Sequence, residues 1–403
     1  MKLVFILVDA LKASYLTKDN MPFLYGIAQK NRYIKHVIPS AGFCERCEIL
    51  SGLDGFDTGN FTAIGYKPEE SSYSGFNFAI FFLRKLVAIH PYFIKYLNKY
   101  VKRRGLLMKP YLIPIKSLPY FALTEDGVPK IKYRTILDSL RDANKTYNLG
   151  KFTTLSPLCE HSALSDIDFI YDCIEKKVDF IPLYIGIIDT KGHVYGDNLT
   201  GLKPYLQYVD NLLFRISEIA DKNDYAFAVL GDHGMVPVRE TIDINKYIKE
   251  CKLKLHKDYE IFIDSTVVRF WFHNDNARLK ITKILSSLDK GTIIDKTNYH
   301  HYRIPLDILN DDGIPIYGDI AWIVNPGILL VPDYFNSSKV QDKGMHGYLK
   351  VDKKHGTGLF VAKSTNITKH TTHESHLKNI CEELCDILEI KRPNCESWIR
   401  TKL

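Results

Sequence analysis

The stretch AFAVLGDHGM, residues 226–235, decides which kind of fold the chain can form. Its first half is a continuous apolar run, and the run ends at Gly231, Asp232 and His233. Such a run without a polar face is typical of a strand buried on both sides in a parallel sheet. Two other runs share this form, each followed directly by an aspartate: Leu3–Val8 before Asp9, and Phe180–Ile188 before Asp189.

Helical patterns lie between these apolar runs, for example over Tyr133–Asn144 and Leu202–Asp221. Strands that alternate with helices predict an α/β fold, here an α/β/α sandwich around a mostly parallel central sheet. Residues 249–345 read differently, with strand-like runs around an amphipathic helix, and they predict an inserted α+β cap. The predicted division is a core of 1–248 and 346–403, with a helical insertion inside 70–150, and a cap of 249–345.

The composition is that of an ordinary globular protein, with 45% hydrophobic and 25% charged residues among 403. The net charge of +7 is mildly basic and is not concentrated in one tract. A nucleic acid polymer is therefore not an expected partner. An anionic small molecule, a membrane surface or a simple surface bias would each agree with this charge.

The chain is expected to be cytoplasmic. The first apolar run stops at Asp9, whereas the apolar core of a signal peptide needs roughly 7–15 residues, and no stretch reaches the ~20 apolar residues of a membrane span. The eight cysteines are scattered, which favours reduced thiols. The aromatic and basic residues of 76–104 allow two interpretations, a peripheral membrane contact or a helical insertion packed on the core.

Acidic and histidine side chains follow the predicted strands. Ionised carboxylates and imidazoles are costly to bury unless they are paired or bound to metal. Mixed oxygen and nitrogen donors suit Zn²⁺, with Mn²⁺ as the alternative. Six such residues divide naturally into two sites of three, and they are Asp9, Asp189, His193, Asp232, His233 and His346.

The ordered motifs ILVDA, PSAGFCE, DTKGH, GDHGM and MHGY resemble the alkaline phosphatase superfamily, nearest to its type I phosphodiesterase and nucleotide pyrophosphatase branch. The resemblance implies an alkaline phosphatase-like fold and a hydrolase that acts on small phosphoesters with two divalent ions. It also implies one metal site of Asp189, His193 and His346, and a second site of Asp9, Asp232 and His233.

In that family a Thr or Ser at the turn before a helix forms a covalent phosphoryl intermediate. Alignment of the turn places Gly42 at this position and Glu45 where an Asn is expected. Three explanations remain open: Ser40 or Cys44 is the nucleophile, a metal-activated hydroxide attacks directly, or catalysis is lost and the chain only binds a ligand. A sulfatase is not expected, because the cysteine of its signature falls at Gly42.

The same turn supplies the candidate substrate-binding residues Gly42, Phe43 and Arg46. Arg46 could bind an anion bidentately, or it could simply be exposed on the helix. Transfer of a phospho-group to a glycan or lipid is the alternative activity, and the unusual insertion at 70–110 motivates it.

Overall fold

The computed structural model describes residues 1–43, 45–71, 73, 82, 85–86, 90, 93, 96, 99, 113–124, 133–153, 163–334 and 342–393. The chain forms two compact units. The first contains Met1–Thr58, Gly127–Arg239 and Asp342–Leu403, and the second contains Gly59–Asp126 and Glu240–Gln341.

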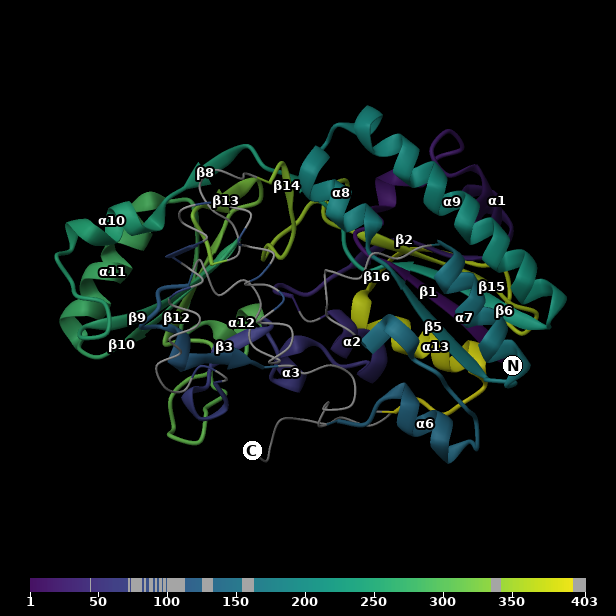
Figure 1. Cartoon of the computed structure of the whole chain (residues 1–403), viewed down its shortest axis with the longest axis horizontal. Helices are drawn as coiled ribbons and strands as arrows, with labels where there is room; N and C mark the ends of the chain where they lie inside the picture. Colours follow the sequence, from purple (N-terminus) through teal and green to yellow (C-terminus); the bar gives the residue numbers. More distant parts are fainter. Residues whose placement is uncertain are drawn as a thin grey trace. The chain divides into compact units, whose positions relative to one another are not determined.

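The first unit is built on a 6-stranded sheet with the order β16-β2-β15-β6-β1-β5 (Figure 1). All its strands run in one direction except β15, which is antiparallel to both of its neighbours. This confirms the predicted α/β fold with a mostly parallel central sheet. The strands are β1 (Lys2–Val8), β2 (Arg32–Ile38), β5 (Phe180–Ile185), β6 (Tyr225–Gly231), β15 (Gly358–Lys363) and β16 (Thr371–His376).

Helices cover both faces of this sheet, and Figure 1 shows α1 and α9 on the opposite side from α13 and α2. Strand β1 explains why both faces are covered: Val4 and Ile6 pack into one apolar core, and Leu3 and Phe5 pack into another. The first core is closed by α1 (Pro22–Lys30), α7 (Ala163–Glu175), α8 (Ile187–Tyr195) and α9 (Leu199–Lys222). The second is closed by α2 (Glu45–Ser51), α6 (Ile136–Asp142) and α13 (Ile380–Leu388).

The sequence predicted a single strand over the apolar run Phe180–Ile188, and this prediction is wrong. Strand β5 ends at Ile185, and α8 begins at Ile187 with Gly186 as its N-cap residue. Ile188 is buried in the same apolar core as Ile185. Because both isoleucines are buried, hydrophobicity alone cannot mark the change from strand to helix.

Short elements complete the first unit. Strands β7 and β14 form an antiparallel pair in which Met345 lies opposite Val236. Cys381 and Cys385 lie on the buried face of α13, as their spacing of one helical turn predicts, and they form no disulfide. The remaining elements are α3 (Gly55–Thr58), β7 (Val236–Pro237), β14 (Gly344–Met345) and the 3-10 helices Ala13–Tyr15, Gly150–Thr153 and Leu377–Asn379.

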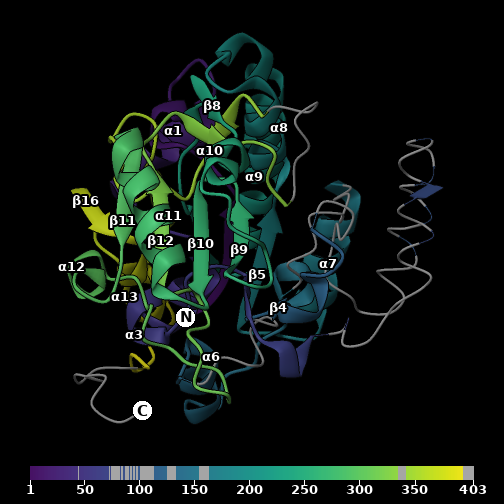
Figure 2. The same ribbon diagram turned by 90° about the vertical axis from the view of Figure 1, so that its left-hand side faces the viewer.

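The second unit contains a 4-stranded antiparallel sheet with the order β11-β12-β10-β9 (Figure 2). Helix α11 (Asp275–Leu288) packs on it through Ala277, Ile281 and Leu285. The strands are β9 (Tyr259–Asp264), β10 (Val267–Phe272), β11 (Gly291–Ile294) and β12 (Ile320–Val324). The other elements are β3 (Ile64–Tyr66), β4 (Phe121–Leu123), β8 (Glu240–Ile242), β13 (Ile328–Leu330), α10 (Ile244–Glu250), α12 (Tyr299–Tyr302) and the 3-10 helices Pro68–Glu70 and Leu118–Tyr120.

The extent of this unit differs from the expected cap of 249–345, because residues 59–126 belong to it as well. Strand β3 pairs with β4, and the fully buried Arg269 of β10 donates a hydrogen bond of 2.6 Å to the carbonyl oxygen of Ile64. These contacts join segments that are far apart in the chain. Most of 76–104, where a membrane contact was considered, lies outside the described residues.

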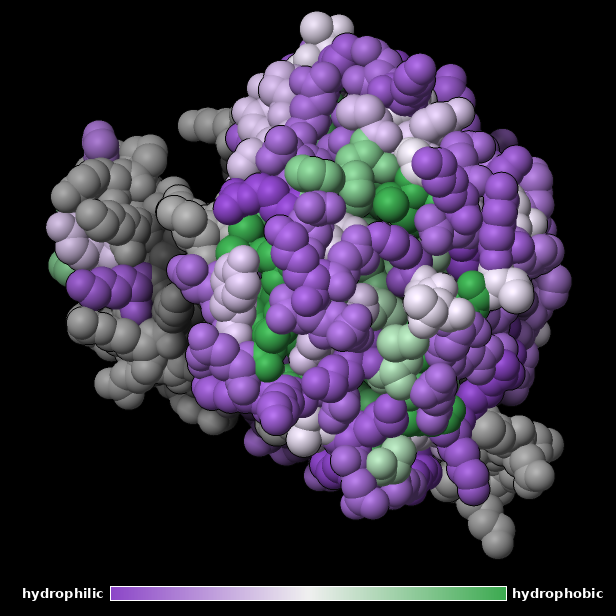
Figure 3. Space-filling view, turned by 90° about the vertical axis from the view of Figure 1, so that its right-hand side faces the viewer, coloured by the Kyte–Doolittle hydropathy of each residue, from purple (hydrophilic) through white to green (hydrophobic). Residues whose placement is uncertain are grey.

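No helix in the described part of the chain combines the length and the apolar character that crossing a membrane requires. The face of the first unit seen in Figure 3 is predominantly hydrophilic, and its hydrophobic side chains form small separate areas.

Candidate metal centre

One edge of the large sheet collects the acidic and histidine side chains that the sequence singled out. Asp9 follows β1, Asp232 follows β6, and α8, which carries Asp189, starts directly after β5. His346 arrives by another route, on the loop that leads into β15. Because β15 is antiparallel to the other strands, its first residue lies at the edge where those strands end.

The first group consists of Asp189, His193 and His346, whose donor atoms all lie within 4.8 Å of one another. Asp189 and His193 are one turn apart on α8, with 3.2 Å between Oδ1 and Nε2, and Nε2 of His346 lies 3.5 Å from the same Oδ1. Nδ1 of His193 lies 2.9 Å from the carbonyl oxygen of Gly344. This contact assigns a proton to Nδ1, so Nε2 is the nitrogen that faces Asp189 and remains for a metal ligand bond.

Two buried polar atoms of this group have the surroundings expected of metal ligands. Oδ1 of Asp189 and Nδ1 of His346 are buried and have no hydrogen-bond partner. Buried polar atoms are almost always hydrogen-bonded, and exceptions often mark a bound ion or water. The donor chemistry of two imidazoles and one carboxylate agrees with a divalent transition metal such as Zn²⁺.

The second group consists of Asp9, Asp232 and His233. Nε2 of His233 lies 3.1 Å from Oδ1 of Asp9 and 3.8 Å from Oδ1 of Asp232. Nδ1 of His233 is 2.8 Å from the carbonyl oxygen of Gly234, so Nε2 is again the nitrogen that remains for a ligand. The backbone amide of Ala10 donates to Asp232 over 3.1 Å and orients this carboxylate.

Close backbone approaches hold the two groups together. A Cβ on Gly358 would lie 1.8 Å from the carbonyl oxygen of Gly231, and a Cβ on Gly234 would lie 2.1 Å from that of His355. Glycine at positions 234 and 358 therefore lets the segment at the start of β15 lie directly against the end of β6. Gly344 also lies against α8, since a Cβ on it would lie 2.6 Å from the carbonyl oxygen of Gly192.

Tyr184 contacts the second group, although the sequence did not identify this tyrosine as a site residue. Its hydroxyl donates a short hydrogen bond to Oδ2 of Asp9, the oxygen that does not face His233. Burial, and next the Asp9 carboxylate, raise the pKa of Tyr184, so the hydroxyl remains a donor. The signal in the sequence was a tyrosine at the end of a strand that is otherwise apolar, FIPLYI.

Arg46 lies beside Tyr184 and not on an open helix surface. Its guanidinium carbon is 4.6 Å from the centre of the Tyr184 ring and 5.9 Å from that of Phe152. Nη1 of Arg46 is buried without a hydrogen-bond partner. The alternative of a simply exposed arginine therefore does not describe this side chain.

The turn before α2 has a backbone suited to glycine at its centre. Gly42 has a φ of +102°, a conformation that residues with a Cβ rarely adopt. The ring of Phe43 meets His346 edge-on, with centroids 5.3 Å apart. Cys44, one of the two candidate nucleophiles, lies outside the described residues. The other, Ser40, lines a pocket with Gly42, Glu45, His233 and His346.

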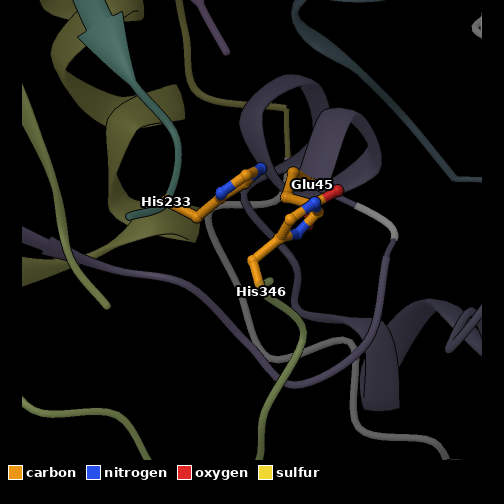
Figure 4. A group of neighbouring side chains, drawn as sticks. All are labelled: Glu45, His233 and His346. Atoms are coloured by element: carbon orange, nitrogen blue, oxygen red, sulfur yellow. The ribbon is translucent and has the colours of Figure 1, made fainter. Parts of the chain in front are cut away.

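Two carboxyl groups of α2 border this turn. Burial raises the pKa of Glu48 to about 8, and the nearby side chain of Ser40 opposes this shift. Glu45 forms a third group of neighbouring donors with His233 and His346 (Figure 4). Burial raises the pKa of Glu45 as well, and the charge of His233 opposes this shift.

The pKa values in this centre are shifted by burial and by the close approach of its carboxylates and histidines. Burial raises the pKa of Asp232 to about 8, against the charge of His233. Burial alone would favour a neutral His193, but Asp189 raises the pKa of His193 to about 9. Without a metal, protons on His193 and His233 therefore compensate the carboxylates that a cation would otherwise neutralise.

Comparisons with known proteins agree with this architecture. The sequence model of the family described as type I phosphodiesterase / nucleotide pyrophosphatase matches residues 3–349. No curated protein matches the chain. The solved structure of human ectonucleotide pyrophosphatase / phosphodiesterase 5 is similar, with a TM-score of 0.67 and 14% identity over 97% of this chain and 96% of that one.

The murine ectonucleotide pyrophosphatase / phosphodiesterase 5 is similar to the same degree, with a TM-score of 0.65 and 14% identity over 97% of this chain and 96% of the murine one. Its inactive variant, in which alanine replaces a threonine, was solved in complex with AMP and has a TM-score of 0.65, with the same identity and coverage. At this identity, the likeness to the solved structures shows the fold.

Proposed function

Because the chain belongs to the type I phosphodiesterase / nucleotide pyrophosphatase family, we propose that it hydrolyses phosphodiesters or nucleotide-type phosphoesters with the help of two divalent metal ions. The observation that carries this proposal is the convergence of two sets of three donors, from distant parts of the chain, at one edge of the sheet. The AMP complex of the murine protein supports a small nucleotide phosphoester as the substrate.

We assign one ion to Asp189, His193 and His346 and the other to Asp9, Asp232 and His233. The donor set favours Zn²⁺, with Mn²⁺ as the alternative. When bound, two such ions neutralise the charge on the phosphoryl oxygens and assist the attacking and leaving oxygens. The protein's own groups orient the ligands. Backbone carbonyl groups bind Nδ1 of His193 and of His233 and so direct Nε2 of each ring toward the metal site. The hydroxyl of Tyr184 orients the carboxylate of Asp9.

The nucleophile of this site is a separate proposal. Ser40 lines the pocket near Glu48, and this carboxyl would act as its general base once it is ionised above its pKa of about 8. Cys44 is the alternative side chain, and direct attack by water without a covalent intermediate is the third route. Gly42 and Phe43 stay proposed substrate-binding residues on the same turn, and Arg46 stays one for a part of the substrate that lies outside the pocket lined by Ser40, His233 and His346.

The metal-dependent function is tested with chelated and reconstituted protein. The protein is treated with a chelator, then supplied with Zn²⁺ or Mn²⁺, and the release of p-nitrophenol from bis-p-nitrophenyl phosphate and from p-nitrophenyl thymidine monophosphate is followed. We expect activity to disappear on chelation and to return with the metal. Full activity in the chelated, metal-free protein would contradict the proposal.

The nucleophile is tested with Ser40→Ala and Cys44→Ala in the presence of methanol. For diesters that differ only in the leaving group, such as a series of aryl esters of thymidine monophosphate, a covalent route gives the methyl ester and the hydrolysis product in a constant ratio, because all of them pass through the same intermediate. The variant that loses both hydrolysis and methanol transfer identifies the nucleophile. If both variants keep activity, direct attack by water is supported.

A further inference from the structure

Glu45 lies beside one histidine of each proposed metal site. Its carboxylate oxygen and ring nitrogens of His233 and His346 all lie within 4.8 Å of one another. His233 belongs to one set of donors and His346 to the other. Figure 4 shows Glu45 next to the two imidazole rings, which come from different loops.

We propose that Glu45 is an additional ligand shared by the two metal ions, and that its charge selects singly charged phosphodiesters over doubly charged phosphomonoesters. This inference rests on the proposed function. It goes beyond that function because it assigns a seventh metal-binding residue and attributes the preference for diesters over monoesters to the charge of that residue.

The charge balance of the site supports the selection. The two sets contain three aspartates, Asp9, Asp189 and Asp232, and neutral histidines, so two divalent ions leave a net charge of +1. Glu45 as a fourth carboxylate brings this net charge to zero. A phosphomonoester dianion then meets no excess of positive charge, whereas a diester carries one negative charge fewer and is repelled less by Glu45.

The walls of the pocket do not restore the positive charge. The described residues that line it include Ser40, Gly42, Gly347 and Tyr348 beside the two histidines, but no lysine or arginine. Arg46 follows Glu45 directly, yet its guanidinium lies against the ring of Tyr184 and does not line this pocket. Dianionic phosphates are usually bound by arginine or lysine clamps, and this pocket has none among its described lining residues.

The test uses Glu45→Gln, which keeps the size of the side chain and removes its charge. Zn²⁺ affinity is measured by titration against a competing chelator. The ratio of kcat/KM for bis-p-nitrophenyl phosphate to that for p-nitrophenyl phosphate is measured at pH 8.5, where the monoester is a dianion. We expect Zn²⁺ affinity to fall at least tenfold and the diester-to-monoester ratio to fall at least tenfold.

Two further variants make the outcome specific. Glu45→Asp keeps the charge, so its substrate ratio is expected to stay within threefold of the original. Glu218→Gln removes an exposed charge on α9 and is expected to change neither measurement. If the original protein binds metal and is active, but Glu45→Gln leaves the metal affinity or the ratio unchanged, the Glu45 inference is overturned. If the original protein binds no metal, the proposed function itself fails.

Discussion

The imidazole rings of His233 and His346 stack face to face, with centroids 3.9 Å apart and planes inclined by only 13°. The stack joins a residue that follows β6 to a residue on the loop before β15, one from each proposed metal site. Two charged rings at this distance would repel each other. Burial, and next the charges of His233 and His193, lower the pKa of His346 well below its usual range, so this ring is neutral.

His346→Ala should therefore affect both sites, because it removes one donor and also exposes one face of His233. We expect the content of bound Zn²⁺, measured by elemental analysis after gel filtration, to fall by at least half, and diesterase activity to fall at least 100-fold. His355→Ala is the matched control, since His355 lies near Gly234 but pairs with Asp352 at 3.0 Å and belongs to neither set. Unchanged zinc in the His346 variant would remove this residue from the ligand set.

Tyr184→Phe tests whether the hydrogen bond to Asp9 matters to the metal site. The substitution keeps the ring that packs against Arg46 and removes only the hydroxyl. Loss of such an outer hydrogen bond typically costs roughly 10–100-fold in metal affinity or activity. Zn²⁺ affinity is measured by competition with a chelator, and Tyr208→Phe, on the exposed face of α9, serves as the control. Equal affinities in the two variants would assign Tyr184 a packing role only.

Gly42→Ala is predicted to destabilise the protein, because a side chain at φ +102° is strained. The cost of a left-handed conformation is roughly 1–2 kcal/mol. Gly26→Ala is the opposite case: Gly26 lies inside α1, and an added Cβ would meet nothing within 4 Å. There alanine should stabilise by roughly 0.5–1 kcal/mol. Urea unfolding of both variants measures the difference, and equal shifts in the same direction would contradict this account of the turn.

The same glycine explains why the nucleophile could not be read from the sequence. The resemblance predicted a side chain at position 42, but the turn there has a backbone that favours glycine. The order of the motifs did predict which donors come together, because strand ends in a parallel sheet lie at a common edge. Their ligand role stays a proposal.

Other features could not be predicted from the sequence because they depend on contacts between segments that are far apart in the chain. No local pattern shows that β3 and β4 belong with Arg269 and the antiparallel sheet. The hydrogen bond from Tyr184 to Asp9 joins two different strands, so it cannot be seen in either strand alone. The resemblance placed Glu45 where the family has an asparagine, and only the structure shows that it lies beside two histidines.

The stability of the chain should depend on pH through Asp264 in the second unit. Burial raises the pKa of Asp264 to about 7, with the nearby Arg269 opposing the shift. Its ordinary value is 3.8. Between these values the folded chain keeps a proton that the unfolded chain has lost. The free energy of unfolding therefore falls as the pH rises through this window, and it levels off above pH of about 7.

Asp264→Asn should remove this dependence because the amide does not titrate. One pKa unit corresponds to about 1.4 kcal/mol, so between pH 5 and pH 7 the unfolding free energy of the original chain should fall by about 2–3 kcal/mol more than that of the variant. Urea unfolding at several pH values measures this difference, with Asp311→Asn at an exposed position as the control. If the two curves stay parallel across the window, Asp264 is already ionised in the folded chain, and its charge is balanced by Arg269 at all these pH values.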